Sequence, residues 1–237
     1  MPVFELPLEY IFPDPNLARD DGLLAVGGDL DPERLLLAYV RGIFPWYSEG
    51  LPILWHSPDP RFVLRIDDLK IGRSLKKSIR KKVFTVKFDA DFRGVISACR
   101  AAKRPDQDGT WITGEMQRGY ERLHDLGYAH STEVYRDDEL VGGLYGVAIG
   151  KMYFGESMFA WDDDASKIGF VVLCRQLQRW GFDLVDSQVY TDHLARFGAV
   201  EVERTSYLKL LSTRVRSEQN VGEWKFDSDF AALEGLF

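Results

Sequence analysis

The sequence is poor in cysteine and has no long hydrophobic run. Its two cysteines, Cys99 and Cys174, lie far apart and match neither a disulfide framework nor the spacing of a zinc site. No stretch approaches the roughly 18 apolar residues that cross a membrane, and residues 1–15 contain prolines and acids where a signal peptide needs a basic start. We therefore expect a cytoplasmic protein with two core thiols and no membrane partner.

The sequence also lacks the motifs of several enzyme classes. No P-loop, G-x-G-x-x-G or G-x-S-x-G string occurs, which disfavours ATP binding, dinucleotide binding and serine-hydrolase chemistry. The histidines form no H-E-x-x-H motif and no i, i+4 pair, so a metal site is not expected. The four histidines are His56, His124, His130 and His193. We expect neither a metal nor an organic cofactor.

The chain contains enough hydrophobic residues to form the core of one large domain or of two small domains. Of its 237 residues, 45% are hydrophobic and 13% are aromatic. The 30 Lys and Arg residues against 37 Asp and Glu residues give a net charge of -7, so the protein as a whole is not a polycation that coats nucleic acid. Any nucleic-acid partner must be held by a local patch.

Positive charge gathers in one block, residues 70–82, which contains seven basic residues and no acidic one. The i, i+4 spacing of Leu75 and Ile79 predicts a helix that buries one face and leaves its cations available to phosphate groups. The cations we expect to be available to phosphate are Arg73, Lys76, Lys77, Arg80 and Lys81. The alternative is an ordinary solvated helix face with no partner.

The chain changes character near residues 60–66, because nine of its ten prolines lie at or before Pro60. This asymmetry predicts a domain boundary. Before the boundary we expect one helix, which begins after Asp31 and stops at Gly42, with loops on both sides.

After the boundary, the hydrophobic period switches between that of helices and that of strands. Helices are predicted over residues 74–82, 92–99, 165–180, 191–197 and 207–215, with another capped at Thr113 and stopped at Gly127. Strands are predicted over residues 83–88, 130–135, 140–148, 152–159 and 183–190. The three strands within 130–159 form an antiparallel meander. The fold class is therefore α+β.

Two polar residues lie on the last predicted strand. Asp186 and Gln188 are two positions apart, so their side chains leave the same face and can touch each other and one substrate. The alternative is that they merely satisfy each other's hydrogen bonds within the sheet.

Four blocks of the sequence together resemble the leucyl/phenylalanyl-tRNA–protein transferases. They run in the order of that family across nearly the whole chain. The blocks are Phe12-Pro13 with 22–30 (GLLAVGGDL); 42–46 (GIFPW) with 57–61 (SPDPR); 109–112 (GTWI); and 155–159 (GESMF) with 186–188 (DSQ). The departures are His56, where the family usually has an aromatic residue, and Ala165, where Asn is usual after Asp164.

The resemblance implies a small N-terminal domain, residues 1–62, and a C-terminal domain, residues 63–237, with the N-acetyltransferase-like (GNAT-like) fold and a mostly antiparallel sheet. It implies an aminoacyltransferase that moves Leu or Phe, with Met as a further donor, from aminoacyl-tRNA (Leu-tRNA or Phe-tRNA) to proteins with an N-terminal Lys or Arg. The product is marked for N-degron degradation. We expect a monomer, and the relative preference for the donors stays open.

The resemblance also assigns roles to residues. Asp186 and Gln188 form the catalytic pair, in which Gln188 contacts the attacking amine. Asp186 polarises or orients Gln188 and draws off positive charge, while Glu156 helps to hold the amine or the aminoacyl group. Because Gln is a poor base, the proton can instead leave through water or the tRNA ribose. The implied substrate pocket consists of Trp46, Trp111, Leu144, Met158, Leu173, Leu177, Val185 and Ser187. Each large apolar residue in that set could equally be ordinary core.

Two rival functions remain. An acetyl-CoA-dependent N-acetyltransferase would need a [QR]-x-x-G-x-[GA] turn around the pyrophosphate, and the sequence contains none. A non-catalytic tRNA-binding module would need the basic block but not Asp186 or Gln188. The acidic run 162–164 is a candidate for binding the N-terminal Lys or Arg, or simply a helix cap.

Overall fold

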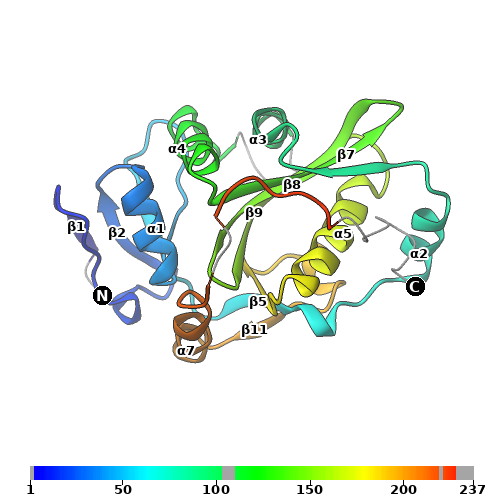
Figure 1. Ribbon diagram of the computed structural model, residues 1–237. Helices are drawn as coiled ribbons and strands as arrows, with labels where there is room; N and C mark the ends of the chain where they lie inside the picture. The colour runs from blue at the N-terminus through cyan, green and yellow to red at the C-terminus, as the bar shows by residue number, and fades with distance from the viewer. Residues whose placement is uncertain (1–2, 103–109, 219–220, 228–237) are drawn as a thin grey trace.

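The structure, a computed structural model, describes residues 3–102, 110–218 and 221–227 and contains two sheets with helices packed around them (Figure 1). The first sheet has four short strands in the order β1-β2-β4-β3. Their bounds are β1 Phe4–Leu6, β2 Leu23–Gly27, β3 Phe44–Pro45 and β4 Leu54–His56. Strands β1 and β2 run parallel, whereas β4 is antiparallel to both β2 and β3.

The second sheet has seven strands in the order β11-β5-β10-β9-β8-β7-β6. Their bounds are β5 Arg61–Arg65, β6 Thr85–Phe88, β7 Ala129–Arg136, β8 Glu139–Ile149, β9 Met152–Ala160, β10 Leu184–Gln188 and β11 Val200–Val202. Neighbouring strands are antiparallel except β9 and β10, which run parallel, so the sheet is of mixed orientation. The predicted meander is confirmed by β7, β8 and β9.

Helices cover both faces of the larger sheet. Their bounds are α1 Pro32–Val40, α2 Arg73–Arg80, α3 Phe92–Ala101, α4 Gly114–Asp125, α5 Ala165–Arg179, α6 Asp192–Ala195 and α7 Arg204–Arg214, with 3-10 turns at Pro15–Leu17 and Ile66–Asp68. On β8, Tyr145 and Val147 belong to the buried cluster that contains α3, whereas Leu144 and Ala148 belong to the cluster that contains α5. Because successive strand residues point to opposite faces, α3 and α5 lie on opposite sides of the sheet.

The predicted helices are confirmed, with small differences at their ends. Thr113 accepts a hydrogen bond from the Met116 backbone N–H at the start of α4, and Gly127 has a φ of +79° after its end. Asp31 holds the N-cap position of α1 but makes no capping hydrogen bond. Its carboxylate instead pairs with Arg122 at 2.9 Å, which ties α1 to α4.

The expectation of loops on both sides of α1 was wrong. Strands β1 and β2 precede α1, and β3 and β4 follow it. Strands β5 and β11 were also not predicted. These strands are only two to five residues long, so no alternating pattern can develop along them, and their pairing partners lie elsewhere in the chain.

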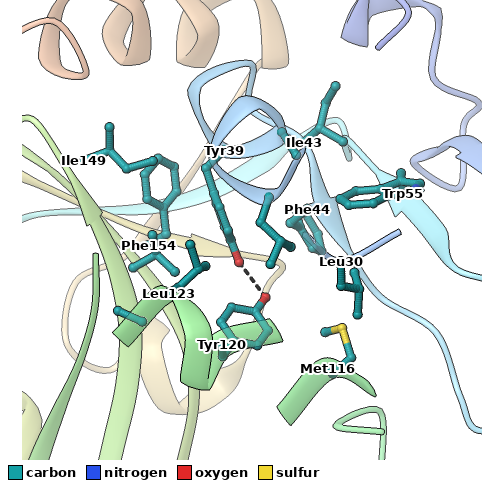
Figure 2. Packing of buried hydrophobic residues seen from close by; sticks show 14 of the residues in the cluster. Leu30, Tyr39, Ile43, Phe44, Trp55, Met116, Tyr120, Leu123, Ile149 and Phe154 are labelled. Carbon is teal, nitrogen blue, oxygen red and sulfur yellow. Dashed lines mark hydrogen bonds between the residues drawn. The ribbon is translucent and has the colours of Figure 1, made fainter. Parts of the chain in front are cut away.

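One sheet ends at His56 and the other begins at Arg61, yet a single cluster of buried residues joins them. Figure 2 shows this cluster where α1 meets α4 and β9. The rings of Tyr39 and Phe154 lie 4.9 Å apart, and the hydroxyls of Tyr39 and Tyr120 are 2.6 Å apart. The division at residues 62 and 63 therefore stays a prediction, because packing is continuous across it.

Gly42 sits at the junction of α1 and α7 and supports a stability prediction. Its φ is +74°, and an added Cβ would lie 2.7 Å from Leu208 Cδ2 and 3.0 Å from Tyr207 Cε1. Gly50 has a similar φ of +82° but nothing within 4 Å of an added Cβ. We expect Gly50→Ala to lower the free energy of unfolding by about 1 kcal/mol through backbone strain, and Gly42→Ala by about 1–3 kcal/mol more through overpacking.

Urea denaturation of the two variants beside the unsubstituted protein measures this difference. Because both substitutions introduce the same left-handed alanine, Gly50→Ala is the matched control for backbone strain. Equal losses at the two positions would contradict the close packing of α7 on Gly42.

Candidate active site

An open cavity of about 660 Å³ lies where β9 and β10 part. The two strands pair only as far as Phe154 and Asp186, after which β9 continues beside β8 and β10 ends at Gln188. The cavity is lined by residues 155–160 of β9, by Val185, Ser187, Gln188 and Val189, by Ser166 and Phe170 of α5, by Thr191, His193 and Leu194, by Leu144, Tyr145 and Tyr153, and by 44–46 and Trp111. Its wall is therefore mostly apolar, with a few polar groups.

Glu156 and Gln188 meet at this cavity. The Gln188 Nε2 donates to Glu156 Oε1 at 2.7 Å. The same oxygen accepts a hydrogen bond from the Tyr39 hydroxyl at 2.7 Å, and Oε2 accepts one from the Tyr120 hydroxyl at 2.8 Å. The carboxyl group of β9 is thus held by one residue each from α1, α4 and β10.

Counting protons in this cluster favours a protonated Glu156. Three short oxygen–oxygen contacts join Tyr39, Tyr120 and Glu156, at 2.6, 2.7 and 2.8 Å. Two hydroxyl protons satisfy only two of the three contacts. A proton on Oε2 reverses the bond to Tyr120, so that the carboxyl donates to Tyr120, Tyr120 donates to Tyr39 and Tyr39 donates to Oε1. Burial raises the pKa of Glu156 to about 7, the hydrogen bonds from Tyr39, Tyr120 and Gln188 oppose that rise, and the charge of Asp186 adds to it.

Asp186 lies behind the cavity wall, where it is fully buried. Its Oδ1 accepts from Arg61 Nε at 2.8 Å, and its Oδ2 accepts from Arg61 Nη2 at 2.6 Å. The Tyr207 hydroxyl also donates to Oδ2, at 2.7 Å. The nearby carboxylate raises the pKa of the Arg61 guanidinium against the effect of burial, so this pair is ionic.

The expectation that Asp186 and Gln188 share one face of a regular strand is corrected by a bulge. The register of β10 on β5 shifts between the two residues, and Gln188 has a φ of +64°. Asp186 Oδ1 accepts from the backbone N–H of Gln188 at 2.9 Å, rather than from its side-chain amide. Asp186 therefore contacts Gln188 through the main chain, and Glu156 contacts its side chain.

Known proteins resemble this chain over nearly its whole length. Residues 63–212 match the family described as leucyl/phenylalanyl-tRNA protein transferase, and residues 28–59 match the N-terminal domain of that family. The leucyl/phenylalanyl-tRNA–protein transferase of Myxococcus xanthus is 53% identical over 226 residues, which cover 94% of this chain and 97% of that protein. The protein of the same name from Solidesulfovibrio magneticus is 54% identical over 224 residues, which cover 94% and 91%.

This chain belongs to the leucyl/phenylalanyl-tRNA–protein transferase family. The resemblance seen in the sequence is thereby confirmed, and the chain is an aminoacyltransferase.

Two solved structures show distant similarity to this transferase. A functionally unknown conserved protein of Staphylococcus epidermidis matches with a TM-score of 0.41 and 15% identity, over 61% of this chain and 57% of that one. L-PGS from Bacillus licheniformis matches with a TM-score of 0.38 and 12% identity, over 72% and 56%. Likenesses of this size do not identify the fold, so the GNAT-like fold stays a prediction.

Most residues of the pocket predicted for the transferase line the cavity. These are Trp46, Trp111, Leu144, Met158, Val185 and Ser187. Leu173 and Leu177 do not line it: both are fully buried on α5 in the core beneath the sheet. Large apolar residues on a helix have the same sequence signature whether they face a cavity or a core, so the sequence did not separate these two from the residues that line the cavity.

The basic helix of the transferase is α2. Leu75 and Ile79 are buried, as their spacing predicts, and the cations Arg73, Lys76, Lys77, Arg80 and Lys81 are exposed. The Ser78 hydroxyl donates to Asp164 Oδ2 at 2.7 Å, which fastens α2 to the start of α5. Within the acidic run, Asp164 also pairs with Lys167 and Asp162 pairs with Arg136, so these two carboxylates have structural partners.

Sequence reasoning missed several groups at the site. Arg61 carries a signal, because it is a cation at the start of the apolar stretch RFVLR and belongs to one of the family blocks. Tyr39, Tyr120 and Tyr207 come from helices far apart in sequence, and no local pattern marks their convergence. His193 lines the cavity with a buried Nε2 that has no hydrogen-bond partner among the described residues.

The described ranges of the transferase contain no cluster of three or more His, Cys, Asp or Glu side chains that could hold a metal ion. They also contain no helix long and apolar enough to cross a membrane. Gly109, part of one family block, lies outside the described residues.

The raised pKa of Glu156 predicts a dependence of stability on pH. A carboxyl whose pKa rises from 4.5 to about 7 on folding binds an extra proton in the folded state between those values. The free energy of unfolding must therefore fall as the pH rises through that window, by on the order of 1–3 kcal/mol from this group. In Glu156→Gln we expect that part of the fall to disappear, because an amide does not titrate but keeps the donor of a protonated carboxyl.

Chemical denaturation at about pH 5 and about pH 7.5 tests this expectation. The exposed Glu201→Gln is the matched control, since it removes one carboxyl that is not part of the Glu156 cluster. A variant at Glu156 that retains the full pH dependence of the unsubstituted protein would show that the carboxyl is ionised in the folded state.

Proposed function

We propose that this transferase moves Leu or Phe, with Met as a further donor, from aminoacyl-tRNA to the α-amino group of proteins that begin with Lys or Arg. The product carries a new N-terminal residue that marks it for degradation. The observation that carries the proposal is the Gln188–Glu156 pair at the edge of an apolar cavity, in a chain of this family.

The reaction needs little chemistry from the protein. The ester of an aminoacyl-tRNA is already activated, and an α-amine with a pKa near about 8 is partly neutral at pH 7. What remains is to hold the amine against the ester carbonyl, to accept a proton and to stabilise the oxyanion. A site with polar amide and carboxyl groups but no activated nucleophile suits that task.

Gln188 and Glu156 take separate parts in this proposal. Since Gln188 Nε2 donates to Glu156, the Oε1 of Gln188 faces the amine as a hydrogen-bond acceptor. As the amine attacks it becomes cationic, and Glu156, with its pKa near 7, favours that charge when ionised. The proton then leaves through water or the tRNA ribose, because an amide oxygen is a weak base.

The apolar wall selects the aminoacyl side chain. Met158 can adapt to a branched or an aromatic guest because its side chain is unbranched. Trp46, which is 42% exposed, and Trp111 lie at the cavity in position to stack on a base of the single-stranded tRNA end. Helix α2 would hold phosphates of the same tRNA.

The acceptor residue, Lys or Arg, requires negative charge at the cavity. Glu156 supplies it inside the cavity when ionised, and Asp163 is the exposed member of the acidic run whose neighbours are paired. We retain as further parts of this proposal the GNAT-like fold, domains of residues 1–62 and 63–237, a monomer, and a cytoplasmic location.

We expect the purified protein to join Leu to an Arg-initiated peptide when given Leu-tRNA alone, without ATP, coenzyme A or added metal. The expectation follows from the activated ester. Mass spectrometry of the peptide measures the product, and a peptide with an N-terminal Asp is the control. Activity that a chelator removes and a metal restores, while the tRNA stays folded, would contradict the expectation. Acetylation of the peptide by acetyl-CoA would instead favour the rival N-acetyltransferase.

Neutralising Lys76, Lys77, Arg80 and Lys81 together is expected to weaken tRNA binding and flatten its salt dependence. Each lost phosphate contact lowers the slope of log K against log salt by about 0.7–0.9. Turnover at saturating tRNA should survive, because α2 does not line the cavity.

A matched variant that neutralises four exposed cations elsewhere, Lys87, Lys209, Arg216 and Lys225, changes the net charge equally. Binding titrations at several salt concentrations should separate the two variants. If the slope of log K against log salt is the same in both variants, α2 is an ordinary solvated helix face and does not bind the tRNA.

A further inference from the structure

We propose that Arg61 and Tyr207 are positioning residues, which act through Asp186 to hold Gln188 in the conformation that the transfer requires. The inference rests on the proposed function, since it assumes that Gln188 meets the amine. It assigns a role to two buried side chains that do not line the cavity.

Arg61 is held on every side by the protein. Two of its nitrogens donate to the two oxygens of Asp186, at 2.8 and 2.6 Å, and Nη1 donates to the Gly42 carbonyl at 3.2 Å. Its guanidinium lies 4.7 Å from the ring centroid of Phe44 and 4.7 Å from that of Tyr207. Because this planar guanidinium binds both carboxylate oxygens, it holds Asp186 in one orientation. The ammonium group of a lysine is flexible and could not do so.

Tyr207 completes the arrangement from α7. Its hydroxyl donates to Asp186 Oδ2 at 2.7 Å while its ring covers the guanidinium of Arg61. With Oδ2 occupied by Tyr207 and Arg61, Oδ1 is left to Arg61 Nε and to the backbone N–H of Gln188. Each oxygen of the Asp186 carboxylate therefore accepts two hydrogen bonds.

The backbone at Gln188 needs such support. Its φ of +64° is unfavourable for a residue with a Cβ, and the Val189 N–H donates to the Ser187 carbonyl at 2.7 Å across it, which makes a tight three-residue turn. The hydrogen bond from Gln188 N–H to Asp186 stabilises this turn. This backbone conformation directs the Gln188 side chain toward Glu156, and its Nε2 lies 2.7 Å from Glu156 Oε1. Strained backbone of this kind persists only where its surroundings enforce it.

The charge of Asp186 has a different role in this view. Because Arg61 neutralises it at contact distance in a buried site, Asp186 has little field left to attract a cationic amine in the cavity. Its contribution is geometric, and removing the guanidinium of Arg61 should displace Gln188 through their shared partner Asp186.

The experiment compares Arg61→Lys and Tyr207→Phe with Arg34→Lys in the full chain. Arg34 is also fully buried and donates to the carbonyls of Leu8 and Pro7. Arg34→Lys is therefore the matched control, because it also replaces a buried guanidinium but does so away from the site. We expect kcat per folded molecule to fall by about 10- to 100-fold in Arg61→Lys and about 3- to 10-fold in Tyr207→Phe, as is usual for a misplaced reacting group. Leu-tRNA affinity should stay within about 2-fold, and Arg34→Lys should lose stability but not kcat.

Two further measurements separate positioning from general destabilisation. Hydrogen exchange at the Gln188 amide should be faster in Arg61→Lys and Tyr207→Phe than in Arg34→Lys, because the acceptor Asp186 is no longer fixed. In a double-mutant cycle, Arg61→Lys should add little to the loss caused by Asp186→Asn, since both act through one carboxylate.

Multiplicative losses in that cycle, or equal kcat values in Arg61→Lys and Arg34→Lys, would overturn the proposal. Failure of the unsubstituted protein to transfer Leu would instead overturn the proposed function, and hydrogen exchange would still report on the positioning of Gln188.

Discussion

The ion pair between Arg61 and Asp186 is the contact on which the site depends. It joins the first residue of β5 to the buried residue of β10 that precedes the bulge, and it reaches Gly42 and Phe44 on one side and Tyr207 of α7 on the other. A buried charge pair is retained at a cost in desolvation, and its benefit is a single defined geometry. Here that geometry sets the backbone of Gln188, so packing behind the cavity wall decides what faces the substrate.

The second carboxyl of the site has a different environment. Among the described residues no cation forms an ion pair with Glu156, whose partners are the hydroxyls of Tyr39 and Tyr120 and the amide of Gln188. Desolvation therefore raises its pKa to about 7. Two carboxyl groups, on neighbouring strands, are therefore prepared for different tasks. Asp186 is a fixed acceptor for Arg61 and for the backbone of Gln188, while Glu156 can change its protonation near neutral pH.

The cavity itself follows from the topology of the larger sheet. The parallel pair β9 and β10 separates after three matched residues, because β9 keeps its pairing with β8 while β10 turns at the Gln188 bulge. Residues 44–46 line the cavity, and Tyr39 of α1 donates a hydrogen bond to Glu156. The N-terminal segment therefore contributes to the site that the larger sheet opens.

By itself, the sequence determined the family and the basic helix, because these are carried by residue type and order along the chain. It also determined the helices and the meander, whose hydrophobic periods extend over many residues. The tertiary structure alone decided that Leu173 and Leu177 belong to the core and that Asp186 meets the backbone of Gln188. It alone brought Tyr39, Tyr120, Arg61 and Tyr207 to the site. Local patterns report which residues prefer burial, but contacts between distant segments and the φ of one bulged residue arise only from how the elements pack.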